Sequence, residues 1–215
     1  MADVAATGTL AGYRYLWQPA SIANAPVLLL LHGTGGDEES LLPLVPMILP
    51  GAAVLSPRGN VLEQGAPRFF RRLAEGVFDM DDLHRRTGEL GRFIDDAATA
   101  HAFDRSRVYA VGYSNGANVA ASLMLTVASP FAGAVFYRAM LPLEPSATPS
   151  LHGVGTLLLS GREDPIVPAA QVERLAALLQ EGGADVQLEW LPGGHQLSQA
   201  DVSKTRNWLA SRASI

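Results

Sequence analysis

The chain has 215 residues, of which 48% are hydrophobic, and it carries a formal net charge of −5 and no cysteine. The lack of cysteine excludes disulfides, thiolate metal sites and a cysteine nucleophile, and the absence of a clustered basic stretch argues against nucleic acid as a partner. Apolar runs such as 25–31 are far shorter than the roughly 20 residues of a membrane-spanning helix, and the N-terminus lacks the pattern of a secretory signal. We therefore expect a single domain over residues 1–215, without a membrane span, in the cytoplasm.

Short apolar runs predict about seven strands, which are residues 12–17, 27–32, 52–57, 107–112, 131–137, 156–161 and 185–191. Most of these runs are apolar throughout, which is typical of strands that are buried on both faces. In the last run, Val186, Leu188 and Trp190 alternate with polar residues, so one face of that strand is expected to be less buried.

Helical patterns lie between the strands. They cover residues 79–101, 114–127 and 198–211, together with a segment that Pro168 can open and Gly182 and Gly183 can close. Strands that alternate with helices of this length predict a mostly parallel sheet covered by helices on both faces. In such sheets the chemistry is carried at the carboxyl ends of the strands.

One of these strand ends carries the sequence GYSNG, with Ser114 between Gly112 and Gly116. A strand, this pattern and then a helix form the context of a nucleophile elbow, in which a strained turn exposes the serine oxygen. A side chain two residues before or after the serine would clash with the tight turn, and glycine has no side chain at these positions. The alternative is a serine that only caps the helix in a tight turn.

A serine hydroxyl needs a base to take its proton, and in this topology the chain order is serine, acid, histidine. Asp164 follows the strand 156–161 and His195 follows the strand 185–191, so both are expected at the same sheet edge as Ser114. Glu163 is the other candidate for the acid. Each residue alone could be an ordinary loop residue, but the three share the expected order and strand positions.

The oxyanion of an acyl-transfer intermediate requires N–H donors. We expect them from the main chain of Asn115, which follows the serine, and of Thr34, in the glycine-rich loop after the strand 27–32. A dinucleotide-binding loop is a rival interpretation of Gly33 to Gly36, but its third glycine would fall at Glu38. No pair of histidines has metal-ligand spacing, so we predict no metal and no other cofactor.

The segment 57–76 leaves the active-site edge of the sheet without a helical pattern, and loops of this length are usually functional or disordered. We expect Phe69 or Phe70 to wall the substrate pocket, and Arg71 or Arg72 to face a polar or anionic group of the substrate. In the alternative, the two phenylalanines pack onto the core and the arginines pair with nearby acids, which are Glu63, Glu75 and Asp79.

With these motifs in hand, the chain resembles the phospholipase/carboxylesterase family of small α/β-hydrolases, which includes acyl-protein thioesterases. The resemblance runs from LLLLHGTGGDEESLLPL through GYSNGANVA and GREDPIVP to PGGHQL. The stretch SPRGNVLEQGAPRFFRRLAEGVFDMDDL is most similar to a bacterial, hydroquinone-linked carboxylesterase branch. The family implies an α/β-hydrolase fold without a large cap domain, with Ser114 as nucleophile, His195 as base, Asp164 as its partner and Thr34 and Asn115 as oxyanion donors.

Two positions depart from the thioesterase branch. Asn115 stands where that branch tends to carry glutamine, and Thr34 stands where it tends to carry a bulky apolar residue. We therefore expect a serine esterase of small carboxylic esters that works through an acyl-enzyme, without a cofactor. A thioesterase or lysophospholipase, a non-catalytic binding protein of the same fold and a nucleotide-binding α/β protein are the alternatives. The sequence leaves the oligomeric state open, a homodimer included.

Overall fold

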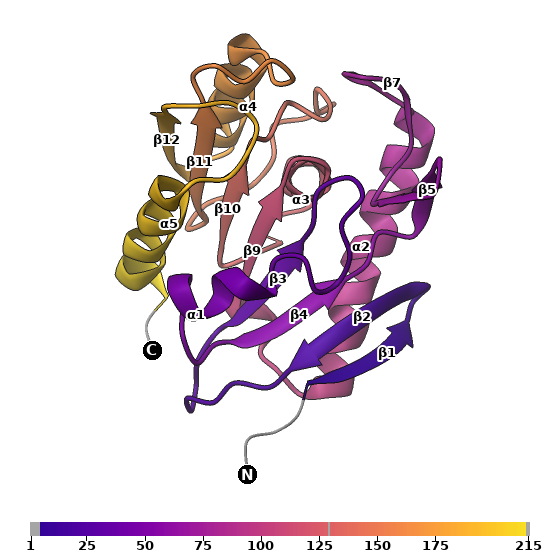
Figure 1. Ribbon diagram of the computed structural model, residues 1–215, viewed down its shortest axis with the longest axis vertical. Helices are drawn as coiled ribbons and strands as arrows, with labels where there is room; N and C mark the ends of the chain where they lie inside the picture. The colour runs from indigo at the N-terminus through magenta and orange to yellow at the C-terminus, as the bar shows by residue number, and fades with distance from the viewer. Residues whose placement is uncertain (1–4, 129, 214–215) are drawn as a thin grey trace.

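The computed structural model describes residues 5–128 and 130–213. At its centre is an eight-stranded sheet in the order β1-β2-β4-β3-β9-β10-β11-β12 (Figure 1). These strands are β1 (Ala6–Leu10), β2 (Tyr13–Gln18), β3 (Val27–Leu31), β4 (Ala53–Pro57), β9 (Val108–Tyr113), β10 (Gly133–Tyr137), β11 (Gly155–Gly161) and β12 (Asp185–Leu191). Neighbouring strands from β4 to β12 pair in parallel, whereas β2 is antiparallel to both β1 and β4. The sheet is therefore mostly parallel, as predicted.

The central strands are apolar on both faces because a hydrophobic cluster lies on each side of the sheet. In β3, Val27, Leu29 and Leu31 belong to the larger cluster, while Leu28 and Leu30 belong to the other. All five side chains are buried. Since successive side chains of a strand point to opposite faces, a sheet with two covered faces requires an uninterrupted apolar run.

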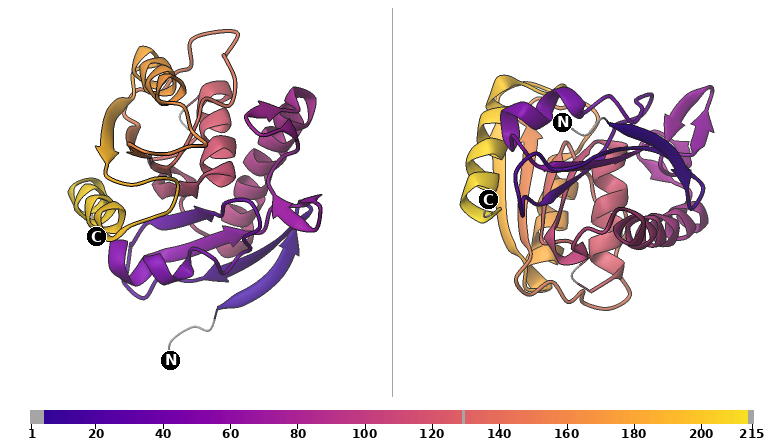
Figure 2. Two further views of the ribbon diagram at one scale, coloured as in Figure 1. Left: turned by 45° about the horizontal axis from the view of Figure 1, so that its top comes forward. Right: turned by 90° about the horizontal axis from the view of Figure 1, so that it is seen from below.

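Helices supply the covering layers (Figure 2). They are α1 (Val45–Ile48), α2 (Met80–His101), α3 (Asn115–Thr126), α4 (Ala169–Glu181) and α5 (Gln199–Arg212), with short 3-10 turns η1 (Leu42–Leu44) and η2 (Arg105–Arg107). Buried residues of α2, α3 and α4 join the larger cluster, and those of α1 and α5 join the other. The four longer helices match the predicted ones to within one or two residues, because each has a local start signal such as Asp79, which caps α2 through the N–H of Asp82.

The eighth strand, β1, was not predicted. It is the edge strand, it is mostly exposed, and its sequence ATGTL has no apolar alternation. Its position follows from the turn at Ala11 and Gly12, whose φ angles of 48° and 82° fold it back onto β2. Backbone pairing holds this strand in place, and side-chain hydrophobicity contributes little.

The segment expected as a long loop folds into two small hairpins. β5 (Val61–Glu63) pairs with β6 (Ala66–Arg68), and β7 (Arg72–Ala74) pairs with β8 (Val77–Phe78). The first hairpin turns at Gln64 and Gly65, with φ angles of 51° and 86°. Both hairpins stand beside the carboxyl edge of the sheet (Figure 1).

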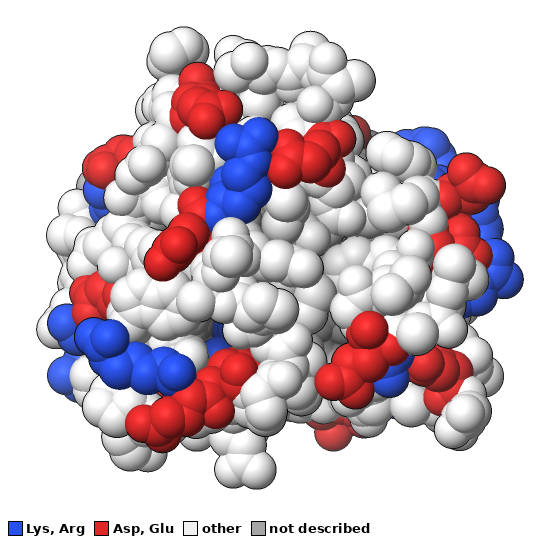
Figure 3. Space-filling model, turned by 90° about the horizontal axis from the view of Figure 1, so that it is seen from above, with Lys and Arg blue, Asp and Glu red and all other residues white. Residues whose placement is uncertain are grey.

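The face above the carboxyl edge carries acidic and basic side chains interspersed among uncharged ones, rather than one broad basic surface (Figure 3). Among residues 5–128 and 130–213, no helix is both long and apolar enough to cross a bilayer.

Candidate active site

The turn from β9 into α3 holds Ser114 in a strained conformation. Its φ and ψ angles are 51° and −114°, a region that residues other than glycine rarely occupy. A Cβ atom on Gly112 would lie 2.7 Å from the Cα of Ala117, and one on Gly116 would lie 2.1 Å from the carbonyl oxygen of Leu31. Glycine is therefore required on both sides of the serine, and the strain places the hydroxyl at the sheet edge.

Ser114, His195 and Asp164 form one hydrogen-bonded chain. Nε2 of His195 lies 2.9 Å from Oγ of Ser114, and Nδ1 lies 2.8 Å from Oδ2 of Asp164. The other carboxylate oxygen of Asp164 accepts from the N–H groups of Ile166 and Val167, at 2.8 and 3.2 Å. The Asp164 side chain is only 2% exposed. A fixed carboxylate against Nδ1 selects the tautomer that leaves Nε2 free to accept a proton.

The loops that carry the acid and the histidine also bind each other. The main-chain N–H of Glu163 donates to the carbonyl of Gly193 at 3.0 Å. A Cβ atom on Gly161 would lie 2.3 Å from the carbonyl oxygen of Gly194. Thus Glu163, the other candidate acid, contributes a main-chain contact and is exposed, whereas Asp164 reaches the imidazole.

Two further residues hold the histidine loop by its main chain. The hydroxyl of Tyr113 donates to the carbonyl of His195 at 3.1 Å. Arg138 donates from Nε to the carbonyl of Gly194 at 2.9 Å and from Nη2 to that of Gln196 at 2.8 Å. Neither residue was predicted from the sequence, although an arginine directly after the apolar run 131–137 is a signal of a buried charge at the carboxyl edge.

The loop with Thr34 is fixed from the side of the first hairpin. Nη1 of Arg68 donates to the Thr34 hydroxyl at 2.6 Å, and the N–H of Gly35 donates to the carbonyl of Pro67 at 2.9 Å. Within the described ranges, neither the N–H of Thr34 nor that of Asn115 donates a hydrogen bond to another residue. Both amides are therefore available to a ligand.

His32 braces the start of the same loop. Its Nδ1 lies 2.7 Å from the carbonyl oxygen of Gly33, and its Nε2 accepts the N–H of Gly59 at 2.9 Å. These contacts require the neutral ring with the proton on Nδ1. Burial lowers the pKa of His32 below its ordinary value, which favours this neutral form.

The side chain of Asn115 ties the elbow to the segment 57–76. Its Oδ1 accepts the N–H of Phe69 at 2.7 Å. Its Nδ2 is buried and has no hydrogen-bond partner among the described residues. Both expected oxyanion donors, Thr34 and Asn115, are thus held by residues 67–69.

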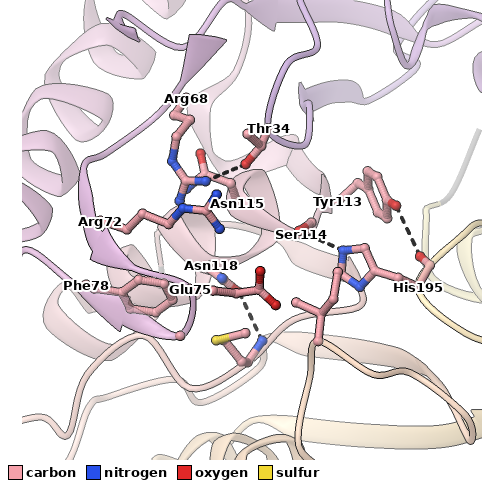
Figure 4. Close-up of a pocket in the computed structure, with 13 residues that line it drawn as sticks. Thr34, Arg68, Arg72, Glu75, Phe78, Tyr113, Ser114, Asn115, Asn118 and His195 are labelled. Carbon is pink, nitrogen blue, oxygen red and sulfur yellow. Dashed lines mark hydrogen bonds between the residues drawn. The ribbon is translucent and has the colours of Figure 1, made fainter. Parts of the chain in front are cut away.

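A cavity of about 270 Å³ opens over the serine. Figure 4 shows Ser114 and His195 facing it, with Arg68 and Arg72 reaching in from the hairpins. Its other lining residues are Thr34, Glu75, Gly76, Phe78, Tyr113, Asn115, Asn118, Met140 and Ile166. The wall therefore combines apolar side chains with charged and amide groups.

Of the four residues expected to touch substrate, which are Phe69, Phe70, Arg71 and Arg72, only Arg72 lines the cavity. Phe69 and Phe70 are fully buried in the larger core cluster and do not line the cavity, because Phe69 turns inward beside His32 and Phe70 packs against Phe78. The aromatic side chains that do line it are Phe78 and Tyr113.

The two arginines also differ. Arg71 points away from the cavity and pairs with Asp79 at 2.7 Å, and its side chain is 61% exposed. Arg72 lines the cavity and also pairs with Glu63 at 2.9 Å. Arg68 lines the cavity beside Arg72 although it is largely buried, and the sequence did not predict it as a site residue.

In the part of the chain that the structure describes, no group of three histidine or acidic side chains is arranged to hold a metal ion.

Comparison with known proteins identifies the family. The model of the phospholipase/carboxylesterase family matches residues 18–212. The chain belongs to this family. A protein of Bacillus subtilis strain 168 that is named as the hydrolase MhqD is 48% identical over 182 residues, which cover 85% of this chain and 91% of MhqD.

Solved structures of family relatives share the fold. A carboxylesterase of Bacillus cereus is 46% identical, with a TM-score of 0.91 over 93% of this chain and 94% of that one. A carboxylesterase of Mesorhizobium loti is 31% identical, with a TM-score of 0.90 over 96% and 98%. YahD, in a structure with malic acid, is 31% identical, with a TM-score of 0.87 over 93% and 99%.

These comparisons show that the protein has the α/β-hydrolase fold. They also show that it is a hydrolytic enzyme of the carboxylesterase type. The sheet has eight strands, one more than expected, because of the edge strand β1.

Proposed function

We propose that this family member is a serine esterase that hydrolyses small carboxylic esters through an acyl-enzyme. The observation that carries the proposal is the continuous hydrogen-bonded chain from Asp164 through His195 to Ser114 at the floor of a cavity. The cavity volume of about 270 Å³ is slightly below the roughly 300 to 1,000 Å³ that ligand sites usually enclose. A small ester fits this size better than a lysophospholipid.

In the first half of the reaction, Oγ of Ser114 attacks the ester carbonyl carbon while Nε2 of His195 takes the hydroxyl proton. The carbonyl oxygen becomes an oxyanion, which the N–H groups of Thr34 and Asn115 stabilise. Asp164 stabilises the imidazolium without taking a proton. When the C–O bond breaks, His195 returns the proton to the departing alkoxide, and the acyl group remains on Ser114.

In the second half, His195 takes a proton from water, and the resulting hydroxide attacks the acyl carbon. The second tetrahedral intermediate collapses as His195 returns the proton to Oγ of Ser114, which releases the carboxylic acid. One ester and one water give one acid and one alcohol. The reaction requires no cofactor.

We also propose a domain organisation, a cellular location and an oligomeric state for the protein. We infer one domain, because the eight-stranded sheet connects the N-terminal and C-terminal parts of the chain without interruption. We place the enzyme in the cytoplasm, which agrees with a chain without cysteine. A small-molecule ester is the expected partner, and a homodimer is a further hypothesis that sedimentation equilibrium tests.

The decisive experiment traps the acyl-enzyme. A short p-nitrophenyl ester should give a burst of p-nitrophenol equal to the enzyme concentration if deacylation is slow, and a fluorophosphonate adduct should map to Ser114. Ser114→Ala should lower kcat by about 10⁴ to 10⁶. An adduct on another serine, or an active Ser114→Ala enzyme, would refute the assignment.

The panel should include thioesters and a series of acyl lengths. Preference for a thioester of the same acyl group would favour the thioesterase alternative with the same triad. The malic acid in the structure of YahD makes small carboxylate-bearing esters natural members of the panel.

A further inference from the structure

The charges around the cavity are not matched pair by pair. Glu63 on β5 lies against two guanidinium groups. It accepts from Nε of Arg72 at 2.9 and 3.1 Å, and one of its oxygens lies 3.3 Å from Nη1 of Arg68. One carboxylate therefore serves two cations, so this side of the cavity has more positive charge than Glu63 neutralises.

The two arginines do not use their donors equally. Arg68 is 3% exposed, and it also donates from Nε to the carbonyl of Phe70 at 3.2 Å and from Nη1 to the Thr34 hydroxyl. Arg72 is 28% exposed and uses only Nε. Among the described residues, no acceptor takes a hydrogen bond from its Nη1 or Nη2.

The free end of Arg72 faces the reaction site. Figure 4 shows its guanidinium reaching from β7 into the cavity, beside Arg68 and Asn115. The buried Nδ2 of Asn115 adds another donor without a partner. The nearness of Arg72 is also one cause, after burial, of the lowered pKa of Arg68. An anion would accept hydrogen bonds from the unused donors and would pair with the guanidinium charge that Glu63 shares between two arginines.

We propose that Arg72 binds a carboxylate of the ester substrate, so that the enzyme prefers small esters with a carboxylate a few atoms from the scissile bond. This inference depends on the proposed esterase function and names its substrate class. The planar guanidinium can bind a carboxylate with its two Nη groups while Nε stays on Glu63. Since Arg72 and Ser114 line the same small cavity, a short molecule can reach both.

The carboxylate of Glu75 disfavours the binding of an anion in this cavity. It is exposed at the turn between β7 and β8, it lines the cavity, and it forms no ion pair with a described residue. An unpaired carboxylate would repel an anionic substrate and attract a cation. On our proposal, Glu75 weakens anion binding, and its removal strengthens it.

The test uses two matched pairs of substrates, which place the charge on either side of the ester. The mono-p-nitrophenyl ester of succinic acid is compared with p-nitrophenyl levulinate, which is neutral and of similar shape. On the alcohol side, p-acetoxybenzoate is compared with p-acetoxybenzamide. The quantity measured is the ratio of kcat/KM for the charged ester to that for its neutral partner.

We expect Arg72→Gln to lower this ratio by about tenfold to a hundredfold in at least one pair, which is the usual range for a lost charged hydrogen bond. Arg72→Lys should restore part of it, because the charge remains but the fork is lost. Glu75→Gln should raise the ratio in that pair. Arg71→Gln is the matched control, since it removes the same charge one residue away and outside the cavity, and it should leave the ratio unchanged.

The proposal is overturned if Arg72→Gln leaves both ratios unchanged, because equal losses on charged and neutral esters would show that Arg72 only holds the hairpin. It is also overturned if Arg71→Gln lowers the ratio as much, which would indicate a long-range field, or if Glu75→Gln lowers it. These outcomes are separate from failure of the esterase function, which would appear as hydrolysis of the neutral esters that survives Ser114→Ala.

Discussion

Arg138 offers a demanding test of how the fold positions the histidine. The residue follows β10 with a φ angle of 54°, and its side chain is 1% exposed. The guanidinium donates five hydrogen bonds, one each to the carbonyls of Leu159, Gly194 and Gln196 and two to the Asp201 carboxylate, at 2.7 to 3.1 Å. Arg138 therefore connects the sheet edge, the loop on both sides of His195 and the start of α5.

Arg138→Met should destabilise the protein strongly. It leaves Asp201, which is 0% exposed, without its cation, and breaking a buried pair in this way costs about 3 to 5 kcal/mol. The carboxylate keeps the N–H and hydroxyl of Ser198, at 2.8 and 2.7 Å, so the loss is not that of an isolated charge. Since a domain is stable by only about 5 to 15 kcal/mol, this variant is expected at the limit of folding.

Arg138→Lys keeps the prediction testable on a folded enzyme. Lysine retains the charge but cannot reach Asp201 and all three carbonyls together, so we expect a loss of about 1 to 3 kcal/mol. The carbonyls of Gly194 and Gln196 then lose their donor, and His195 shifts. A displacement of about 1 Å at the reaction site can cost 10²-fold, so kcat should fall by about tenfold to a hundredfold.

Urea unfolding measures the free energy, and hydrolysis of a p-nitrophenyl ester below the unfolding transition measures kcat. Arg174→Lys is the control, because Arg174 is an exposed arginine that binds Glu144 at 2.8 Å, and surface pairs contribute little. If Arg138→Lys has the stability and kcat of the native enzyme, the positioning argument is wrong.

Three further predictions concern single residues. Asp164→Asn should fold normally but lower kcat by about 10⁴, because the tautomer of His195 is no longer fixed; near-native kcat, with activity lost instead in Glu163→Gln, would reassign the acid. Gly116→Ala should unfold at clearly lower urea concentration, because the new Cβ would meet the Leu31 carbonyl at 2.1 Å, whereas Gly65→Ala, with open space around it, should suffer only from its positive φ. Burial lowers the pKa of His32, so the unfolded chain binds a proton that the folded one resists, and the free energy of unfolding should fall as the pH drops below about 6.5. His32→Gln should make that fall shallower, and an unchanged slope by urea unfolding at several pH values would contradict it.

Local sequence patterns specify the strands, the helices and the serine turn of this protein. Buried parallel strands require apolar runs, and the elbow requires glycine at 112 and 116, so both leave local patterns that can be read without coordinates. The chain order of Ser114, Asp164 and His195 follows from the same patterns, because each residue lies in the connection that follows the carboxyl end of a strand. Strand β1 could not be predicted, because it is held by backbone pairing with β2 and its sequence has no apolar pattern.

The directions of the side chains around the cavity, in contrast, depend on three-dimensional packing. The stretch Arg68 to Arg72 contains three arginines and two phenylalanines, and nothing in its order separates Arg72, in the cavity, from Arg71, outside it. Two tight hairpins and the burial of Phe69 and Phe70 set those directions. Arg138 likewise binds Gly194 of the histidine loop and Asp201 of α5, which lie 56 and 63 positions away in the sequence. Contacts of this kind depend on packing between distant segments, and such packing leaves no periodic trace in the sequence.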